Sequence, residues 1–199
     1  MITSTVGLII VFAIVFSLCI FIIWLLPNQK GYFRIFPSIT LYPNNEVEAL
    51  KVKEITDNRT SDDIKFFHLT DYAGPISAFR QEFPQHESLW KNITLNRIIW
   101  SPLIVALKLI VNRARPKQTS QNIAFIETNT TNTPAYPSGH SFEAYLLARQ
   151  LEKRDPALSK RAWELAEKCS NARVKGGVHY PSDGAFSKSI VKRIPTWML

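Results

Sequence analysis

Cysteine is scarce in this sequence, which contains only Cys19 and Cys169. Cys19 lies in an apolar block near the start of the chain and Cys169 lies in an expected helix near the other end, so we expect no disulfide between them. No group of cysteine and histidine residues has the spacing of a zinc site. We therefore expect neither a metal nor a cofactor.

Strand-like alternation of polar and apolar residues does not persist anywhere, and no internal repeat is found. Apolar residues instead recur at spacings of three and four over residues 93–114, which predicts a core helix that Pro102 kinks or starts afresh. A shorter helix is expected over residues 75–90, broken at Pro84. Three more are expected over residues 139–152, 157–171 and 183–193. The predicted fold class is all-α.

Acidic residues are outnumbered, with 16 Asp and Glu against 24 Lys and Arg and a net charge of +8. Such a balance suits nucleic acid, an anionic membrane surface or an anionic substrate, and it does not choose among them. No recognised nucleic-acid-binding motif supports the first, so we expect no nucleic-acid partner.

A long apolar run occurs once, from Val6 to Leu26, where 21 residues carry no charge. A helix of this length spans roughly the 30 Å of a bilayer core. No small-residue cleavage site follows it. We expect residues 1–27 to form an uncleaved single-pass membrane anchor, with a removed signal peptide as the alternative.

The signals for membrane orientation disagree. Lys30 and Arg34 follow the apolar run and no basic residue precedes it, which favours a cytoplasmic C-terminal part. Glycosylation-type sequons at Asn58, Asn92 and Asn129 favour a secretory route. We expect the C-terminal part to be extracytoplasmic (that is, periplasmic or lumenal), and keep the other orientation open.

The rest of the chain divides by composition. Residues 28–65 are predicted to be a linker, because proline and asparagine punctuate them and their apolar pieces are short. A compact domain is expected over residues 66–199. Within it, residues 117–137 are polar and rich in Thr and Asn, which predicts a long loop of the kind that often carries function.

Three clusters carry candidate chemistry, and the first is a pair of cations. Lys108 and Arg115 are seven residues apart, which places both on one helix face that ends at Pro116. Two cations on an otherwise apolar face suit an anionic ligand. Two solvated basic residues would give the same pattern.

The second cluster precedes an expected helix and reads Pro137-Ser-Gly-His140. Ser138 is a natural N-cap, and the free N–H groups of a helix N-terminus bind anions. Gly139 lets the backbone approach such an anion, and His140 could donate a proton to it. A capped helix with a surface histidine is the alternative.

The third cluster contains Arg173, His179 and Asp183. The spacing of four lets Asp183 reach the His179 ring, and a carboxylate on one ring nitrogen leaves the other nitrogen nucleophilic. Arg173 adds a guanidinium fork that suits phosphate. In isolation, the His–Asp pair would be a structural hydrogen bond.

The three clusters in this order, K-x6-R-P, P-S-G-H and R-x5-H-x3-D, resemble those of the type 2 phosphatidic acid phosphatase and vanadium haloperoxidase superfamily. The resemblance covers roughly residues 66–194, and it is greatest to the class A bacterial acid phosphatases, because residues 141–170 are amphipathic rather than membrane-spanning. It implies a helical bundle of the acid phosphatase/vanadium haloperoxidase type, here preceded by one transmembrane helix.

The resemblance also implies a phosphatase that hydrolyses phosphate monoesters without a metal, through a phosphohistidine. It makes His179 the nucleophile, Asp183 the residue that orients it, and His140 the acid and base. The implied phosphate-binding residues are Lys108, Arg115, Ser138, Gly139 and Arg173. A bell-shaped pH profile is expected, since one histidine must start neutral and the other protonated.

One position departs from the superfamily's third motif, which usually has serine directly before the arginine. Here that residue is Ala172, and Ser170 is poorly placed to replace it. Loss of the hydroxyl should weaken phosphate binding by about 1 kcal/mol.

Other functions stay open. One is a lipid phosphate phosphatase acting on phosphatidic acid, or on isoprenyl or diacylglycerol pyrophosphate. The others are a vanadate-dependent haloperoxidase and a membrane-tethered scaffold with a decayed site. The expected partners are a phosphorylated small molecule or lipid phosphate and the membrane, and a homo-oligomer is left open.

Overall fold

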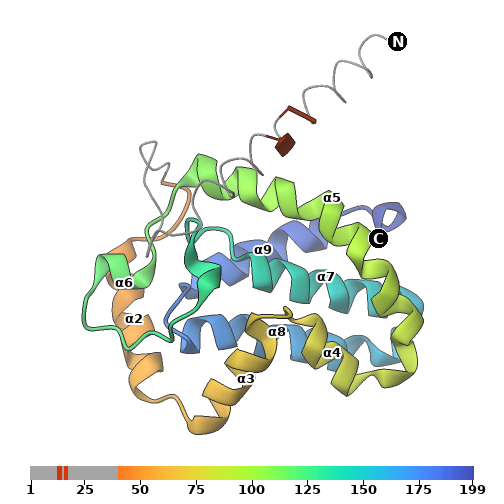
Figure 1. Ribbon diagram of the computed structural model, residues 1–199, viewed down its shortest axis with the longest axis horizontal. Coiled ribbons are helices and arrows are strands. Elements are labelled where there is room, and N and C mark those ends of the chain that lie inside the picture. The colour runs from red at the N-terminus through yellow and green to blue at the C-terminus, as the bar shows by residue number, and fades with distance from the viewer. Residues whose placement is uncertain (1–12, 15, 18–39) are drawn as a thin grey trace.

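The structure is a computed structural model that describes residues 13–14, 16–17 and 40–199 (Figure 1). Residues 40–199 contain helices and no strand, which confirms the all-α class. The α-helices of this part are α2 (Asn45–Asp57), α3 (Ser61–Asp71), α4 (Ile76–Glu82), α5 (Glu87–Val111), α6 (Pro116–Thr119), α7 (Gly139–Arg154), α8 (Ser159–Lys175) and α9 (Pro181–Arg193). Short 3₁₀ turns occur at Pro84–His86, Asn129–Thr131, Pro156–Leu158 and Thr196–Met198.

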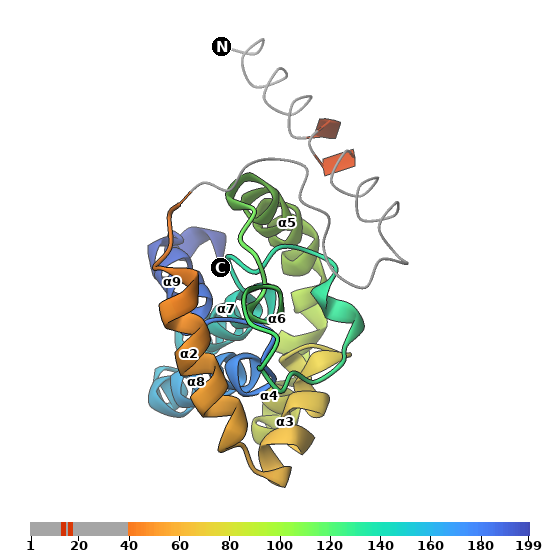
Figure 2. The same cartoon turned by 90° about the vertical axis from the view of Figure 1, so that its left-hand side faces the viewer.

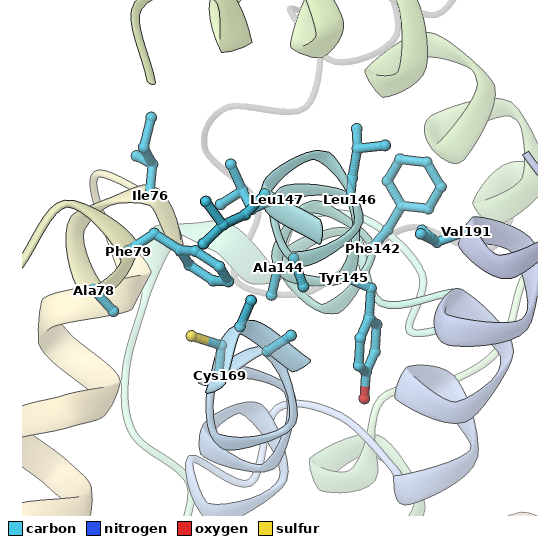
Figure 3. Close-up of a cluster of buried hydrophobic side chains, with 14 of the residues drawn as sticks. Ile76, Ala78, Phe79, Phe142, Ala144, Tyr145, Leu146, Leu147, Cys169 and Val191 are labelled. Atoms are coloured by element: carbon cyan, nitrogen blue, oxygen red, sulfur yellow. The ribbon is translucent and has the colours of Figure 1, made fainter. Parts of the chain in front are cut away.

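Helix α7 is the central element of the bundle. It packs most extensively on α8 and α9, and α4 and α5 cover its remaining sides (Figures 1 and 2). Apolar side chains leave α7 in several directions, which is the pattern of a helix buried on all sides. In Figure 3, Leu147 lies near Phe79 of α4, and Phe142 lies near Val191 of α9. This central position brings the N-terminus of α7 close to the ends of its neighbours.

Helix α5 is a single continuous helix that contains Pro102, so the expected fresh start at that residue does not occur. It ends at Val111, and the C-cap residue Asn112 adopts the left-handed conformation with φ 53° and ψ 44°. Asparagine tolerates this conformation, and its N–H donates to the Lys108 carbonyl at 2.7 Å. The chain turns away here, directly after Lys108 and before Arg115. The expected break after the short helix is confirmed, since α4 ends before Pro84.

The linker predicted over residues 28–65 is wrong for the described residues from Asn45 onward, which form α2 and the start of α3. Asn44, taken as linker punctuation, is the N-cap of α2, and its side chain accepts from the Glu46 N–H at 2.8 Å. Helix α2 packs on α6 and α8. It buries one face at a spacing of four, Glu48, Val52 and Thr56. The division of the chain into domains stays a prediction.

Among the described residues, no helix combines the length and apolar character needed to cross a membrane. The run from Val6 to Leu26 lies almost wholly outside these residues. The anchor over residues 1–27 and the membrane orientation therefore stay predictions.

Candidate active site

His179 and Asp183 meet at the start of α9. Pro181 opens this helix, and Asp183 in its first turn accepts from the Tyr180 N–H at 2.9 Å, through Oδ2. The same oxygen lies 2.9 Å from Nδ1 of His179. Both side chains are buried, with Asp183 0% and His179 3% exposed. A carboxylate that accepts from Nδ1–H leaves the lone pair of the ring on Nε2.

Arg115 faces the other nitrogen of the His179 ring. Its Nη1 lies 3.0 Å from Nε2 and donates to the Val178 carbonyl at 2.7 Å. Its Nε donates to the Thr133 carbonyl at 3.0 Å. Because a guanidinium has no acceptor, Nε2 must be the acceptor, which requires the Nδ1–H tautomer. Arg115 and Asp183 therefore select the same tautomer from opposite sides of the ring.

Lys108 joins the first cluster to the second. It is 5% exposed, and its Nζ donates to the Pro134 carbonyl at 2.6 Å. A Cβ added to Gly139 would lie 4.0 Å from Lys108 Cε, so the start of α7 lies against this side chain. Burial, followed by the charge of Arg115, lowers the pKa of Lys108 well below its usual value. A bound anion would favour the charged ammonium.

Arg173 is held by residues that the sequence analysis did not single out. Its Nη1 pairs with Asp71 Oδ1 at 2.7 Å, and its Nη2 donates to Thr130 Oγ1 at 3.0 Å. Its Nε is buried and has no hydrogen-bond partner within the described part of the chain. A buried donor without an acceptor is uncommon in folded proteins. This N–H is available to a bound anion.

His140 lies beside Arg173 in the first turn of α7. Its Nε2 is 2.9 Å from the Asp71 carbonyl oxygen. Burial, followed by the charge of Arg173, lowers the pKa of His140 to about 3. Burial and Arg115 also lower the pKa of His179. Both shifts favour the neutral imidazole, whereas the expected mechanism requires one histidine to start protonated.

Ser138 caps α7 and is fully buried. Its Oγ accepts from the Ser141 hydroxyl at 2.8 Å, and Ser141 accepts in turn from Ser170 at 2.9 Å. This chain of hydroxyls leaves the Ser138 O–H free to act as a donor. The Ser170 hydroxyl therefore supports Ser138 and does not stand in for the hydroxyl missing at Ala172.

Arg113 lies behind Asp183 and was missed by the sequence analysis. It is fully buried, and its Nη1 donates to Asp183 Oδ1 at 2.6 Å. Its Nη2 donates to Glu48 Oε2 at 2.7 Å. Burial raises the pKa of Asp183, and the charge of Arg113 opposes that shift. Two features of the sequence could have pointed to the pair of Arg113 and Glu48. Arg113 lies two residues before Arg115, and Glu48 begins a run with Val52 and Thr56 at a helical spacing of four.

Comparison with protein families gives a match, in which residues 92–190 fit the sequence model of the PAP2 superfamily. A comparison with curated protein sequences gave no match. The matched range contains every candidate residue of the three sequence clusters. It does not include Glu48 or Asp71.

Proposed function

We propose that the chain, a phosphatase of the PAP2 superfamily, hydrolyses phosphate monoesters through a phosphohistidine on His179. One observation carries this proposal. The His179 ring is held at Nδ1 by Asp183 at 2.9 Å, and its Nε2 faces Arg115 at 3.0 Å. This arrangement presents a nucleophilic lone pair where a cation would hold a phosphoryl oxygen.

Binding of the phosphoryl group would use donors that now bind neutral acceptors. Lys108 and Arg115 donate to backbone carbonyls, and phosphate oxygens would replace these acceptors. The Nε of Arg173, the Ser138 hydroxyl and the Gly139 N–H would add further bonds. Donors fixed before the reaction stabilise the charge that gathers on the phosphoryl oxygens in the transition state.

The reaction would proceed in two displacements at phosphorus. In the first, Nε2 of His179 attacks in line, the P–N bond forms, the ester P–O bond breaks and the leaving alkoxide takes a proton from His140. In the second, water attacks phosphorus, its proton passes to His140 and the P–N bond breaks. Asp183 stabilises the imidazolium that exists between the two steps.

The proton for the first step would arrive with the substrate. His140 is neutral in the free protein, because its pKa is lowered to about 3. A phosphate monoester has a second pKa of about 6, so its monoanion carries a proton at mildly acidic pH. The negative charge of the bound phosphoryl group raises the pKa of His140 and lets the imidazole accept that proton.

A lipid phosphate is the second candidate substrate. The helix that carries Lys108 also exposes two large apolar side chains, Leu103 at 38% and Ile110 at 55%. An apolar tail or an adjacent lipid surface would cover them, and an anchor at residues 1–27 would hold the site near such a surface. We propose the acid phosphatase-type bundle, one preceding transmembrane helix and an extracytoplasmic site as the setting of either activity.

The test uses the full-length protein in detergent, with a chelator present throughout. Phosphate release from p-nitrophenyl phosphate is measured beside release from a lipid phosphate in mixed micelles. His179→Ala should lower kcat by about 10⁴-fold or more, as removal of a catalytic nucleophile does. His68→Ala, at an exposed histidine of α3, is the matched control.

The intermediate gives a second readout. Brief incubation with ³²P-labelled substrate should label the protein with an acid-labile, base-stable phosphate that maps to His179. Labelling of another residue, or a His179→Ala variant that keeps most of its activity, would refute the proposed nucleophile.

A further inference from the structure

The guanidinium of Arg113 is enclosed on every edge and on both faces. Arg113 is not one of the motif residues, so the three motifs do not explain this enclosure. Two aromatic rings cover its faces, with ring centroids 3.9 Å away for Tyr180 and 4.4 Å away for Tyr42. Its N–H groups donate to Asn45 Oδ1 at 2.9 Å, Pro43 O at 3.5 Å, Glu48 Oε2 at 2.7 Å, Ser182 Oγ at 2.7 Å and Asp183 Oδ1 at 2.6 Å. A side chain fixed at so many points has one position, and that position is set by α2 and α9.

Arg113 acts on the carboxylate that orients the nucleophile. Asp183 is fully buried, and burial favours the protonated form of a carboxyl group. A protonated Asp183 would donate to the His179 ring, and the ring proton would then reside on Nε2. That tautomer has no lone pair with which to attack phosphorus. An opposite charge at 2.6 Å on Oδ1 keeps Asp183 an acceptor.

Arg113 also fixes the direction of the carboxylate. Oδ1 of Asp183 accepts from Arg113, whereas Oδ2 accepts from the Tyr180 N–H and lies against His179. With one oxygen anchored on each side, the plane of the group cannot turn without breaking a bond. Oδ2 therefore stays in line with Nδ1 of the ring.

Glu48 holds Arg113 from the other side. Its Oε2 accepts from Arg113 Nη2, and its Oε1 accepts from the Ser182 N–H at 3.1 Å. The Ser182 hydroxyl bridges Arg113 and Glu48, because it accepts from Arg113 Nη1 and donates to Glu48. Glu48 is 5% exposed, so this ion pair is shielded from solvent. Helix α2 is thus tied to the first turn of α9.

We propose that Arg113 and Glu48 are positioning residues of the active site: Arg113 holds the Asp183 carboxylate as the ionised, oriented partner of His179, and Glu48 holds Arg113 in place. This inference rests on the proposed phosphohistidine reaction. It makes α2, which lies outside the matched residues 92–190, a part of the active site.

The first test compares Arg113→Lys and Arg113→Gln with the wild type, all as full-length proteins. Lysine keeps the charge but cannot bridge two carboxylates, and glutamine removes the charge. We expect kcat to fall about 10- to 100-fold, the range seen when a group that orients a metal-binding histidine from behind is removed. KM should change less than about threefold, because Arg113 does not reach the substrate. The surface pair of Arg80 with Glu87 supplies the matched control, Arg80→Lys.

The pH profile separates positioning from a general loss of structure. The charged groups that face Asp183 are Arg113, His179, Lys108 and, behind Arg113, Glu48. Without Arg113 the carboxyl should hold its proton to higher pH, so the acidic limb of kcat should move upward in Arg113→Gln and remain in place in Arg80→Lys. A loss of activity with an unmoved limb and a raised KM would overturn the proposal.

The second test requires no catalysis. The Nδ1 proton of His179, held by a buried carboxylate, should give a low-field proton NMR resonance that His179→Ala removes. We expect Arg113→Gln to shift or abolish this resonance, and Arg80→Lys to leave it unchanged. If the wild type released no phosphate, the proposed function would fail while this resonance still decided the positioning role.

If the Arg113 variants do not fold, Glu48→Gln provides a variant that disturbs the packing less. The carboxamide keeps the shape of the side chain and removes its charge, so we expect about a three- to tenfold lower kcat and a shifted resonance. The control is Glu54→Gln, at an exposed position of the same helix. A folded Glu48→Gln protein with wild-type kcat, pH profile and resonance would overturn the inference.

Discussion

Arg113 and Arg115 are two residues apart, and both are buried, yet they lie on opposite sides of His179 with different partners. Arg115 faces Nε2 and donates to the carbonyls of Thr133 and Val178. Arg113 lies behind Asp183 and donates to two carboxylates. We call the side of Nε2, with Arg115 and the other phosphate-binding residues of the three clusters, the front of the site. We call the side of Asp183, with Arg113 and Glu48, the back.

The difference in partners decides what each arginine can do. A carbonyl is a dipole without net charge, so the bonds from Arg115 to carbonyl oxygens can be exchanged for bonds to phosphate oxygens. Arg113 lies between two buried carboxylates, and breaking such a pair costs about 3–5 kcal/mol. The bonds at the front can therefore be exchanged when a ligand binds and leaves, whereas those at the back stay formed. Equal charge, burial and residue type do not imply equal function.

Among the variants that separate front from back, the largest expected effect comes from removing the front charge. Arg115→Gln should lower kcat/KM by about 10²- to 10³-fold, the loss that follows removal of one donor to a transition-state oxygen. Unlike the Arg113 variants, it should also weaken competitive inhibition by inorganic phosphate, because Arg115 is proposed to bind that ion. Steady-state rates with and without phosphate measure both quantities.

The control for this variant is Lys117→Gln, at an exposed basic residue nearby. Unchanged phosphate inhibition in Arg115→Gln, or equal weakening in Arg113→Gln, would remove the distinction between front and back.

The pH dependence gives the next effect, since the front cations act on both histidines. Burial, followed by the charge of Arg173, lowers the pKa of His140 to about 3, and burial, followed by the charge of Arg115, lowers the pKa of His179 well below its usual value. Activity should then follow the substrate's own proton. We expect kcat/KM to be level near pH 5 and to fall about tenfold per unit above the second pKa of the substrate, near 6.

Two aryl phosphates with different second pKa values distinguish the source of this limb. If the proton arrives with the substrate, the falling limb moves with the substrate. A limb that stays in place for both substrates would assign the proton to a group of the protein instead, and would contradict the proposed role of a neutral His140.

The front of the site could be predicted from the sequence, because its residues lie in short motifs whose spacing has a local meaning. His179 precedes Asp183 by four residues across a helix start marked by Pro181, and Ser138 and His140 mark the start of another helix. Local geometry of this kind needs no knowledge of the fold. The structure places these groups beside Lys108, Arg115 and Arg173, and their roles stay predictions.

The back could not be predicted, because its contacts join distant parts of the chain. Glu48 meets Arg113 across 65 positions. At the front, the contact of Asp71 with Arg173, across 102 positions, escaped prediction for the same reason. Glu48 also lies where asparagines and charged residues suggested a linker. Asn44 and Asn58 cap the two ends of α2, and the buried face of this helix is partly polar because it meets a buried arginine. A rule based on apolar periodicity fails where the core itself is charged.

The smallest expected effect concerns Ala172, the one position of the front that departs from the superfamily pattern. It is 3% exposed and precedes Arg173 on α8. Ala172→Ser adds a neutral donor next to the phosphate cradle, and one such bond is worth about 1 kcal/mol, or about fivefold in kcat/KM. The gain should appear with p-nitrophenyl phosphate. Without a ligand, the new hydroxyl is buried with no assured acceptor and should lower the melting temperature.

Ala162→Ser separates these two effects, because Ala162 is a fully buried alanine of the same helix, far along it from Arg173. It should lose stability without gaining activity. If Ala172→Ser also gains nothing, the existing donors already satisfy the phosphate. Arg173 is one of them, and it is held by the Thr130 hydroxyl, which accepts from it at 3.0 Å, and by Asp71 at 2.7 Å. In that case, Thr130→Val, which removes one of the two holds on Arg173, should lower kcat/KM in the natural sequence.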